Sequence, residues 1–201
     1  VAWERAAIDH YCVDIYLTVY NKSGEVFVDR PWLTLMIDLF TGKVLAFSIS
    51  FEKPSRRAVA KVLRACVRNH QKLPREIIFD RGAEFKSVYL ASLLAHHSII
   101  LSLRPASHSR FGGEVEGFFG EFMKQWLSQR EGNLANFKEA RSVDGKMAPR
   151  KKAVLSPSGF HKELSAFCKW RENKCRGTGS HSSEALFEQS SLDFPHIARS
   201  V

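Results

Sequence analysis

The sequence predicts an α/β fold in which a mixed β-sheet is flanked by helices. Three segments rich in β-branched and aromatic residues come first, and turn residues separate each from the next. Segments with helical apolar spacing then alternate with short apolar runs, which is the pattern of successive β and α units. Hairpin strands followed by such units indicate one sheet with antiparallel and parallel neighbours, and we expect five strands in it.

The antiparallel part is expected from three strands in the first quarter of the chain. They cover residues 7–20, 32–40 and 43–51. A polar turn with the sequence NKSGE follows the first strand, and Thr41-Gly42 makes a tight turn between the other two. Three strands joined in this way predict an antiparallel meander.

A helix is expected at 55–70, directly after the meander. Pro54 stops the sheet and Ser55 is a suitable N-cap. One face is apolar, formed by Val59, Val62, Leu63, Cys66 and Val67. A second face at the same helical spacing is basic, formed by Arg57, Lys61, Arg64 and Arg68.

The rest of the chain alternates between strand and helix before it becomes loop-rich. We expect a strand at 76–80, a helix at 83–97, a strand at 98–103, a polar loop at 104–113, a helix from Glu114 to about Arg130, a loop-rich segment at 131–158, and short helices near 160–175 and 181–190. This order of elements is the one found in the ribonuclease-H-like fold. We expect the core at 1–135, with a basic loop and C-terminal helices at 136–201 completing or extending it.

The basic residues are gathered in two blocks. The formal net charge is +9, yet residues 53–75 carry eight basic residues and no acidic one. Residues 141–176 carry ten basic and three acidic residues. Two basic blocks on an otherwise acidic chain favour a polyanionic partner such as nucleic acid, although such blocks can also be solvated faces.

Composition excludes some classes of protein. No apolar run approaches the roughly 20 residues that span a bilayer, so we expect no membrane partner. The four cysteines form no C-x-x-C pair, so we expect free thiols in a reducing compartment, the cytoplasm; a zinc site from His161, Cys168, Cys175 and His181 is a weaker alternative. The N-terminus has neither a starting Met nor a signal-peptide pattern, and we expect a segment of a longer protein.

Three acidic residues are candidates for metal binding. Asp9 lies inside the first apolar strand, Asp80 ends the fourth strand, and Glu116 lies in the first turn of the helix that follows the polar loop. A carboxylate in an apolar strand is costly unless it is compensated, and Mg²⁺ is a hard cation that carboxylates can hold. Each residue also has a structural alternative: a turn or ion-pair partner for Asp9, an N-cap for Asp80, and a helix-dipole partner for Glu116.

Three short motifs occur in a diagnostic order. They are Asp9-His10, the run DRGAEF that begins at Asp80, and the run FGGEVE that ends at Glu116. Seventy residues separate the first aspartate from the second, and 35 separate the second from the glutamate. This pattern resembles the D, D-x35-E signature of the retroviral-integrase superfamily. The stretch 30–55 also resembles these catalytic cores, most closely those of bacterial transposases of the Mu-phage and Tn-seven-like type.

The resemblance implies a site and its cofactor. It implies that Asp9, Asp80 and Glu116 bind two Mg²⁺ ions, for which Mn²⁺ can substitute, and that Asp14, Asp38 and Glu84 do not. Two positions depart from the usual motifs: Arg81 stands where Asn is common, and Gly117 follows the glutamate. Glu114 is the rival for the third carboxylate, but two positions on a helix differ by about 200°, so both cannot face the same ions.

The resemblance also implies an activity and partners. It implies a DNA transposase or integrase core that cleaves transposon ends and transfers the 3′-OH into target DNA, in a bacterial cell. The implied partners are DNA, further copies of the chain in a transposition complex and other transposition proteins. We expect Arg104, Arg110, Lys151 and Lys152 to contact DNA. The alternatives are a ribonuclease-H-like nuclease without strand transfer and an inactive, domesticated DNA-binding module.

Overall fold

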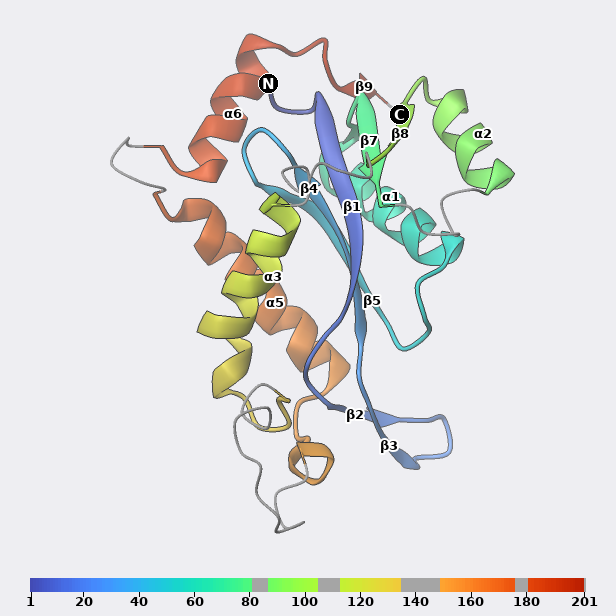
Figure 1. The fold of residues 1–201 in the computed structure, drawn as a ribbon, viewed down its shortest axis with the longest axis vertical. Coiled ribbons are helices and arrows are strands. Elements are labelled where there is room, and N and C mark those ends of the chain that lie inside the picture. Colours follow the sequence, from blue (N-terminus) through green and yellow to red (C-terminus); the bar gives the residue numbers. More distant parts are fainter. Residues whose placement is uncertain (81–86, 105–112, 135–148, 176–180, 201) are drawn as a thin grey trace.

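A five-stranded mixed sheet forms the centre of the molecule (Figure 1). The computed structural model describes residues 1–80, 87–104, 113–134, 149–175 and 181–200. The strands, in their order across the sheet, are β5 (Val44–Ser50), β4 (Trp32–Asp38), β1 (Arg5–Cys12), β7 (Glu76–Phe79) and β8 (Ile100–Leu103). The first three are antiparallel, and β1, β7 and β8 are parallel. The predicted fold class is confirmed.

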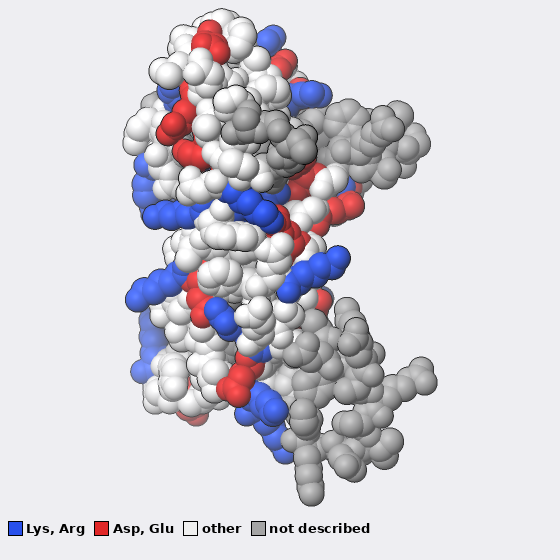
Figure 2. Space-filling view, turned by 90° about the vertical axis from the view of Figure 1, so that its left-hand side faces the viewer, with Lys and Arg blue, Asp and Glu red and all other residues white. Residues whose placement is uncertain are grey.

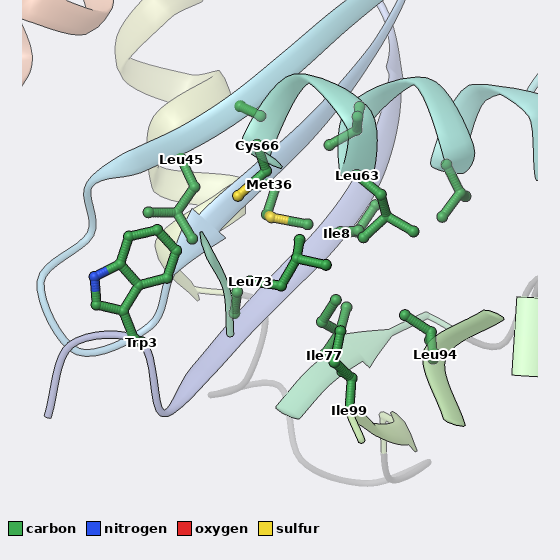
Figure 3. Close-up of a cluster of buried hydrophobic side chains, with 14 of the residues drawn as sticks. Trp3, Ile8, Met36, Leu45, Leu63, Cys66, Leu73, Ile77, Leu94 and Ile99 are labelled. Carbon is green, nitrogen blue, oxygen red and sulfur yellow. The ribbon is translucent and has the colours of Figure 1, made fainter. Parts of the chain in front are cut away.

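One face of the sheet is covered by helices α1 (Arg56–His70) and α2 (Val88–His96). The apolar face predicted for α1 is confirmed, because Val59, Val62 and Cys66 are fully buried. These side chains meet Ile8, Met36 and Ile77 of the sheet in one cluster (Figure 3). Ser55 occupies the N-cap position of α1 as expected, but its side chain makes no capping hydrogen bond.

The opposite face is covered by α3 (Gly113–Gln125) and α5 (Pro157–Asn173). Their contribution is mainly aromatic: Phe118, Phe122, Phe160 and Phe167 are buried together against the sheet. A short 3₁₀ helix, η3 (Leu127–Gln129), follows α3, so the α-helix ends earlier than the predicted limit near Arg130.

The predicted first strand at 7–20 is wrong in its length. β1 ends at Cys12, and a separate ribbon follows, formed by β2 (Leu17–Tyr20) and β3 (Val26–Asp29). Between β1 and β2 the chain bends at Asp14, whose side chain is held by polar partners. The Asp14 carboxylate accepts a hydrogen bond from Arg30 at 2.6 Å and another from the Tyr11 hydroxyl at 3.0 Å. The segment is rich in Val, Ile, Tyr and Thr on both sides of this bend, which is why the sequence suggested one strand.

The C-terminal part packs on the same two clusters as the rest of the chain. α5 lies in the second cluster, and Phe187 of α6 (Ser183–Asp193) lies in the first. The remaining short elements are η5 (Pro149–Lys152), β6 (Lys72–Leu73) and β9 (Arg199–Ser200). The division at residue 135 stays a prediction. Within the described residues, no helix combines the length and apolarity needed to cross a membrane.

Candidate active site

Two of the predicted carboxylates lie side by side on neighbouring strands. β1 and β7 run parallel with Ile8 opposite Phe79, so the next residues along, Asp9 and Asp80, follow at the same level of the sheet. Side chains alternate between the two faces of a strand. Ile8 and Phe79 are buried in the α1 cluster, and Asp9 and Asp80 therefore belong to the α3 side of the sheet.

The third predicted carboxylate, Glu116, belongs to α3, which packs on the same face of the sheet. Val115 and Phe119 are buried against the sheet, and the Phe119 ring stacks on Tyr11 with 4.6 Å between centroids. Tyr11 is two residues beyond Asp9 and on the same face of β1. The contact between Phe119 and Tyr11 therefore fixes the helix directly beside the strand that carries Asp9. Glu116 is an exposed residue of the first turn of this helix.

Two further carboxylates, Asp80 and Glu116, lie close enough to Asp9 to act on its charge. The Asp9 side chain is 24% exposed, and burial raises its pKa above the usual value. The negative charges of Asp80 and Glu116 raise this pKa further. Two contacts act in the opposite direction: the backbone N–H of His10 donates to Oδ1 at 2.7 Å, and an Nη of Arg104 lies 3.7 Å from Oδ2. Asp9 is thus a partly buried acid between two other acids, with one cation nearby.

Glu114 lies on a different side of α3. It lines a surface hollow together with Gly117, Glu121, Arg171 and Lys174 near the end of α5. Glu116, in contrast, is among the charges that act on Asp9. The rotation of about 200° between positions two apart on a helix accounts for this difference. The geometry therefore favours Glu116 over Glu114 as the third member of the site.

The aspartates that were expected to take no part in metal binding have structural partners. Asp38 is fully buried and accepts hydrogen bonds from the backbone N–H groups of Trp3, Phe40 and Thr41 and from the Thr41 hydroxyl. Asp14 is paired with Arg30. Both therefore have partners of their own, apart from Asp9, Asp80 and Glu116. Glu84 and Arg81 lie outside the described residues.

The residues of the site fit a divalent metal ion. All three donors are carboxylates, which are the ligands that Mg²⁺ and Mn²⁺ prefer. Asp9 is partly buried and faces two like charges, a combination that a bound cation would relieve. Within the described ranges, no three His, Cys, Asp or Glu side chains are gathered tightly enough to enclose one ion. Water and substrate oxygens would therefore have to complete the coordination of any metal held by these carboxylates.

This fold is shared with the catalytic cores of retroviral integrases. The core domain of BIV integrase superposes with a TM-score of 0.60 at 13% identity, covering 96% of this chain and 99% of that one. The HTLV-2 integrase catalytic core in complex with magnesium gives a TM-score of 0.57 at 12% identity, covering 93% and 97%. At these identities the likeness shows the fold, which is ribonuclease-H-like as predicted.

Sequence comparison points to bacterial transposases. Residues 7–73 match the family of the TnsB C-terminal domain. The matched segment includes Asp9 and the antiparallel strands. The transposase for transposon Tn552 of Staphylococcus aureus is 26% identical over 135 residues, which is 64% of this chain and 27% of that protein. The predicted resemblance to transposase and integrase cores is confirmed, and the chain spans about a quarter of this relative.

The residues expected to contact DNA lie in different parts of this transposase-like core. Arg104 follows β8 and points to Asp9, a contact that the sequence analysis missed although β8 is the strand beyond β7. Lys151 and Lys152 are exposed on η5, near the ribbon formed by β2 and β3. Arg110 lies outside the described residues.

The basic residues of α1 and those of α5 lie on opposite faces of the sheet. The four basic residues of α1 (Arg57, Lys61, Arg64 and Arg68) are exposed as predicted, but α1 covers the face opposite to the carboxylates. Three basic residues of the second block, Lys162, Lys169 and Arg171, belong to α5, on the face that holds the carboxylates. Figure 2 shows the side of the molecule on which α3 and α5 lie, and basic and acidic side chains are interspersed there.

Proposed function

We propose that this chain is the catalytic core of a DNA transposase or integrase. The proposed reaction is metal-dependent cleavage at transposon ends, followed by transfer of the freed 3′-OH into target DNA. One observation carries the proposal: on a ribonuclease-H-like sheet, Asp9 of β1 lies close enough to Asp80, which directly follows β7, and to Glu116 of α3 for both charges to act on it. The TnsB family match and the Tn552 relative support the choice of DNA as the substrate.

The three carboxylates would hold the metal ions, and the chain would position the substrate around them. Two bound divalent ions supply activation of the attacking oxygen and stabilisation of the leaving oxygen in phosphoryl transfer. Asp9 and Asp80 are held by neighbouring strands, so their spacing is set by the rigid sheet. Arg104 offsets part of the charge of Asp9, and a guanidinium beside this site is suited to contact a phosphate.

The proposed partners are DNA, further copies of the chain and other transposition proteins. A structural neighbour with a TM-score of 0.59 is the intasome of simian T-cell lymphotropic virus in complex with a PP2A regulatory subunit. We propose that this chain, too, works within a protein–DNA complex, in the cytoplasm of a bacterial cell. The origin of the Tn552 relative in Staphylococcus aureus supports a bacterial setting.

The deciding experiment uses the full-length protein with labelled transposon-end DNA and an unlabelled target. We expect cleaved ends and joined products with Mg²⁺ or Mn²⁺, neither product in EDTA, and DNA binding without efficient catalysis in Ca²⁺, whose looser coordination suits this chemistry poorly. Cleavage without joined products would identify a ribonuclease-H-like nuclease. DNA binding without cleavage under any of these metal conditions would identify an inactive DNA-binding module.

A further inference from the structure

A buried arginine of α5 connects the helix that carries Glu116 to the central sheet. Arg171 is only 3% exposed, although arginine is rarely buried without partners. Its Nε donates to the Glu121 carboxylate on α3 at 3.1 Å, and an Nη donates to the carbonyl oxygen of Gly42 at 2.7 Å. The guanidinium also lies over the Phe118 ring, 5.3 Å from its centroid. One side chain thus contacts α3 at two points and the β4–β5 turn at a third.

The β4–β5 turn is a rigid attachment point for this arginine. Gly42 adopts a positive φ of 70°, and its N–H donates to the Asp38 carbonyl at 2.8 Å. The Asp38 carboxylate in turn binds the Thr41 backbone and hydroxyl. β4 leads into this turn, and it pairs with β1, where Leu35 is opposite Asp9. Arg171 therefore connects α3 to the strand ladder that carries Asp9.

The N-terminal half of α3 needs such an attachment because its own sequence forms helix weakly. Gly113 and Gly117 lie within it and Gly120 follows directly, and a Cβ added at any of them would meet nothing within 4 Å. Each glycine costs about 0.5–1 kcal/mol of helix stability relative to alanine. The segment that follows α3 has a separate attachment, since Trp126 and Arg130 both donate to Glu163 of α5.

We propose that Arg171 is a positioning residue, which holds the first turns of α3 so that Glu116 faces Asp9 and Asp80. The proposal rests on the proposed function, because it assigns Arg171 a task in assembling that site. Glu121 is five residues beyond Glu116 on the same helix, and Phe118 is two beyond it. A shift of α3 at these contacts would move the Glu116 carboxylate while Asp9 and Asp80 stay fixed by the sheet.

The test measures metal binding directly as well as catalysis. Mn²⁺ affinity is determined from the free-ion EPR signal in the presence of cleaved transposon-end DNA, and kcat and KM are determined for strand transfer by the full-length protein. We expect Arg171→Met to weaken Mn²⁺ binding and lower kcat by about tenfold, the lower end for residues that orient metal ligands, with an unchanged KM for DNA. Arg171→Lys keeps the charge but not the forked geometry, so we expect an intermediate loss.

Two variants provide matched controls. Arg130→Met removes the arginine–glutamate contact of the segment that follows α3, remote from Glu116, and is expected to lower Tm with little change in Mn²⁺ affinity. Lys174→Met removes the exposed partner of Glu121 and is expected to change neither. An arginine with a purely structural role would behave like Arg130, lowering Tm while leaving Mn²⁺ affinity and kcat unchanged.

The outcomes separate this inference from the proposed function. If the unmodified protein binds no Mn²⁺ and joins no DNA, the proposed function fails and the inference with it. If the unmodified protein is active and Arg171→Met matches it in Mn²⁺ affinity and kcat, only the inference fails. Should Arg171→Met be unfolded at the assay temperature, Glu121→Gln decides: it weakens the same contact and keeps a hydrogen-bond acceptor. Wild-type Mn²⁺ affinity in folded Glu121→Gln would then overturn the inference.

Discussion

The two faces of the central sheet differ in what their polar residues do. The face under α1 and α2 is mainly an apolar cluster. The charged residues of α1 lie on the outer surface of the helix, and the buried Asp38 on this side is hydrogen-bonded to Trp3 and within its own turn. The face under α3 and α5 contains polar groups at depth: Asp9 is partly buried, and Arg171 is almost fully buried between α3 and the β4–β5 turn. Burial of charge is costly, so the charged groups buried on each face need a reason.

The difference teaches that burial alone does not identify a functional acid. Asp9 and Asp38 lie on adjacent strands, and burial raises the pKa of both. Asp38 receives four hydrogen bonds and therefore fixes a turn. Asp9 receives one backbone hydrogen bond, faces two further carboxylates and has a cation 3.7 Å away. A buried acid surrounded by other acids is the arrangement that a metal ion would stabilise.

The largest expected effect comes from removing the carboxylates themselves. Asp9→Ala, Asp80→Ala and Glu116→Ala should each lower cleavage and strand transfer by at least about a thousandfold in the full-length enzyme, because the metal site carries the chemistry. DNA binding, measured separately by fluorescence anisotropy, should persist. Glu114→Ala is the matched control on the same helix turn and should keep substantial activity. An inactive Glu114→Ala beside an active Glu116→Ala would reverse the assignment.

The contrast between Asp9 and Asp38 predicts opposite effects on stability. Asp38→Ala leaves four donors without their acceptor and should destabilise the fold by about 2–4 kcal/mol, measured by urea denaturation at pH 7. Burial raises the folded-state pKa of Asp9 above the ordinary aspartate value of 3.8. The folded protein therefore binds this proton more tightly than the unfolded chain, and the stability it contributes below about pH 3.8 is lost as pH rises through the folded pKa.

In the metal-free protein at neutral pH, the ionised Asp9 consequently lowers the free energy of unfolding. Asp9→Asn should remove that cost, so its Tm in EDTA at pH 7 should equal or exceed that of the unmodified protein, and its stability should fall less between pH 4 and pH 7. A loss of stability similar to that of Asp38→Ala would show that Asp9 is structural. The comparison uses EDTA because bound metal would stabilise the unmodified protein selectively.

The sequence predicted the sheet well because its signals are local. Apolar runs bounded by turn residues marked β4 and β5, and apolar helical spacing marked α1. The break after Cys12 was missed because it depends on Arg30 reaching back to Asp14 across the β2–β3 ribbon. Spacing singled out the carboxylates, but Arg171 could not be found in this way. Its partners, Glu121 and Gly42, are 50 and 129 residues away in the chain, and only packing brings them together.

A smaller effect is expected from the basic residues of η5. Lys151 and Lys152 are exposed on η5, which lies near β2, where Thr18 bonds to Ala153, and shortly before the start of α5. If both neutralise phosphates of duplex DNA, Lys151→Glu/Lys152→Glu should reduce the slope of log K against log salt by about 1.8, at about 0.9 for each contact. The measurement is a salt titration of DNA binding by the full-length protein. An unchanged slope would remove both lysines from the DNA interface.

The smallest effect is expected from the basic face of α1, although it carries the more concentrated charge. Arg57, Lys61, Arg64 and Arg68 lie off the apolar face and are exposed, so reversing all four to Glu should leave the fold intact, as circular dichroism and Tm would check. α1 covers the sheet face opposite to the carboxylates, and at 0.1 M salt charges act over only about 10 Å through solvent. DNA held at Asp9 would therefore not be neutralised by this helix, and the salt slope should stay within experimental error of the unmodified protein.

A slope reduced by about 3.6, the value for four lost phosphate contacts, would instead show that DNA also passes along the α1 face. It would remove the distinction between the two faces as far as DNA binding is concerned, while leaving the assignment of the carboxylates untouched.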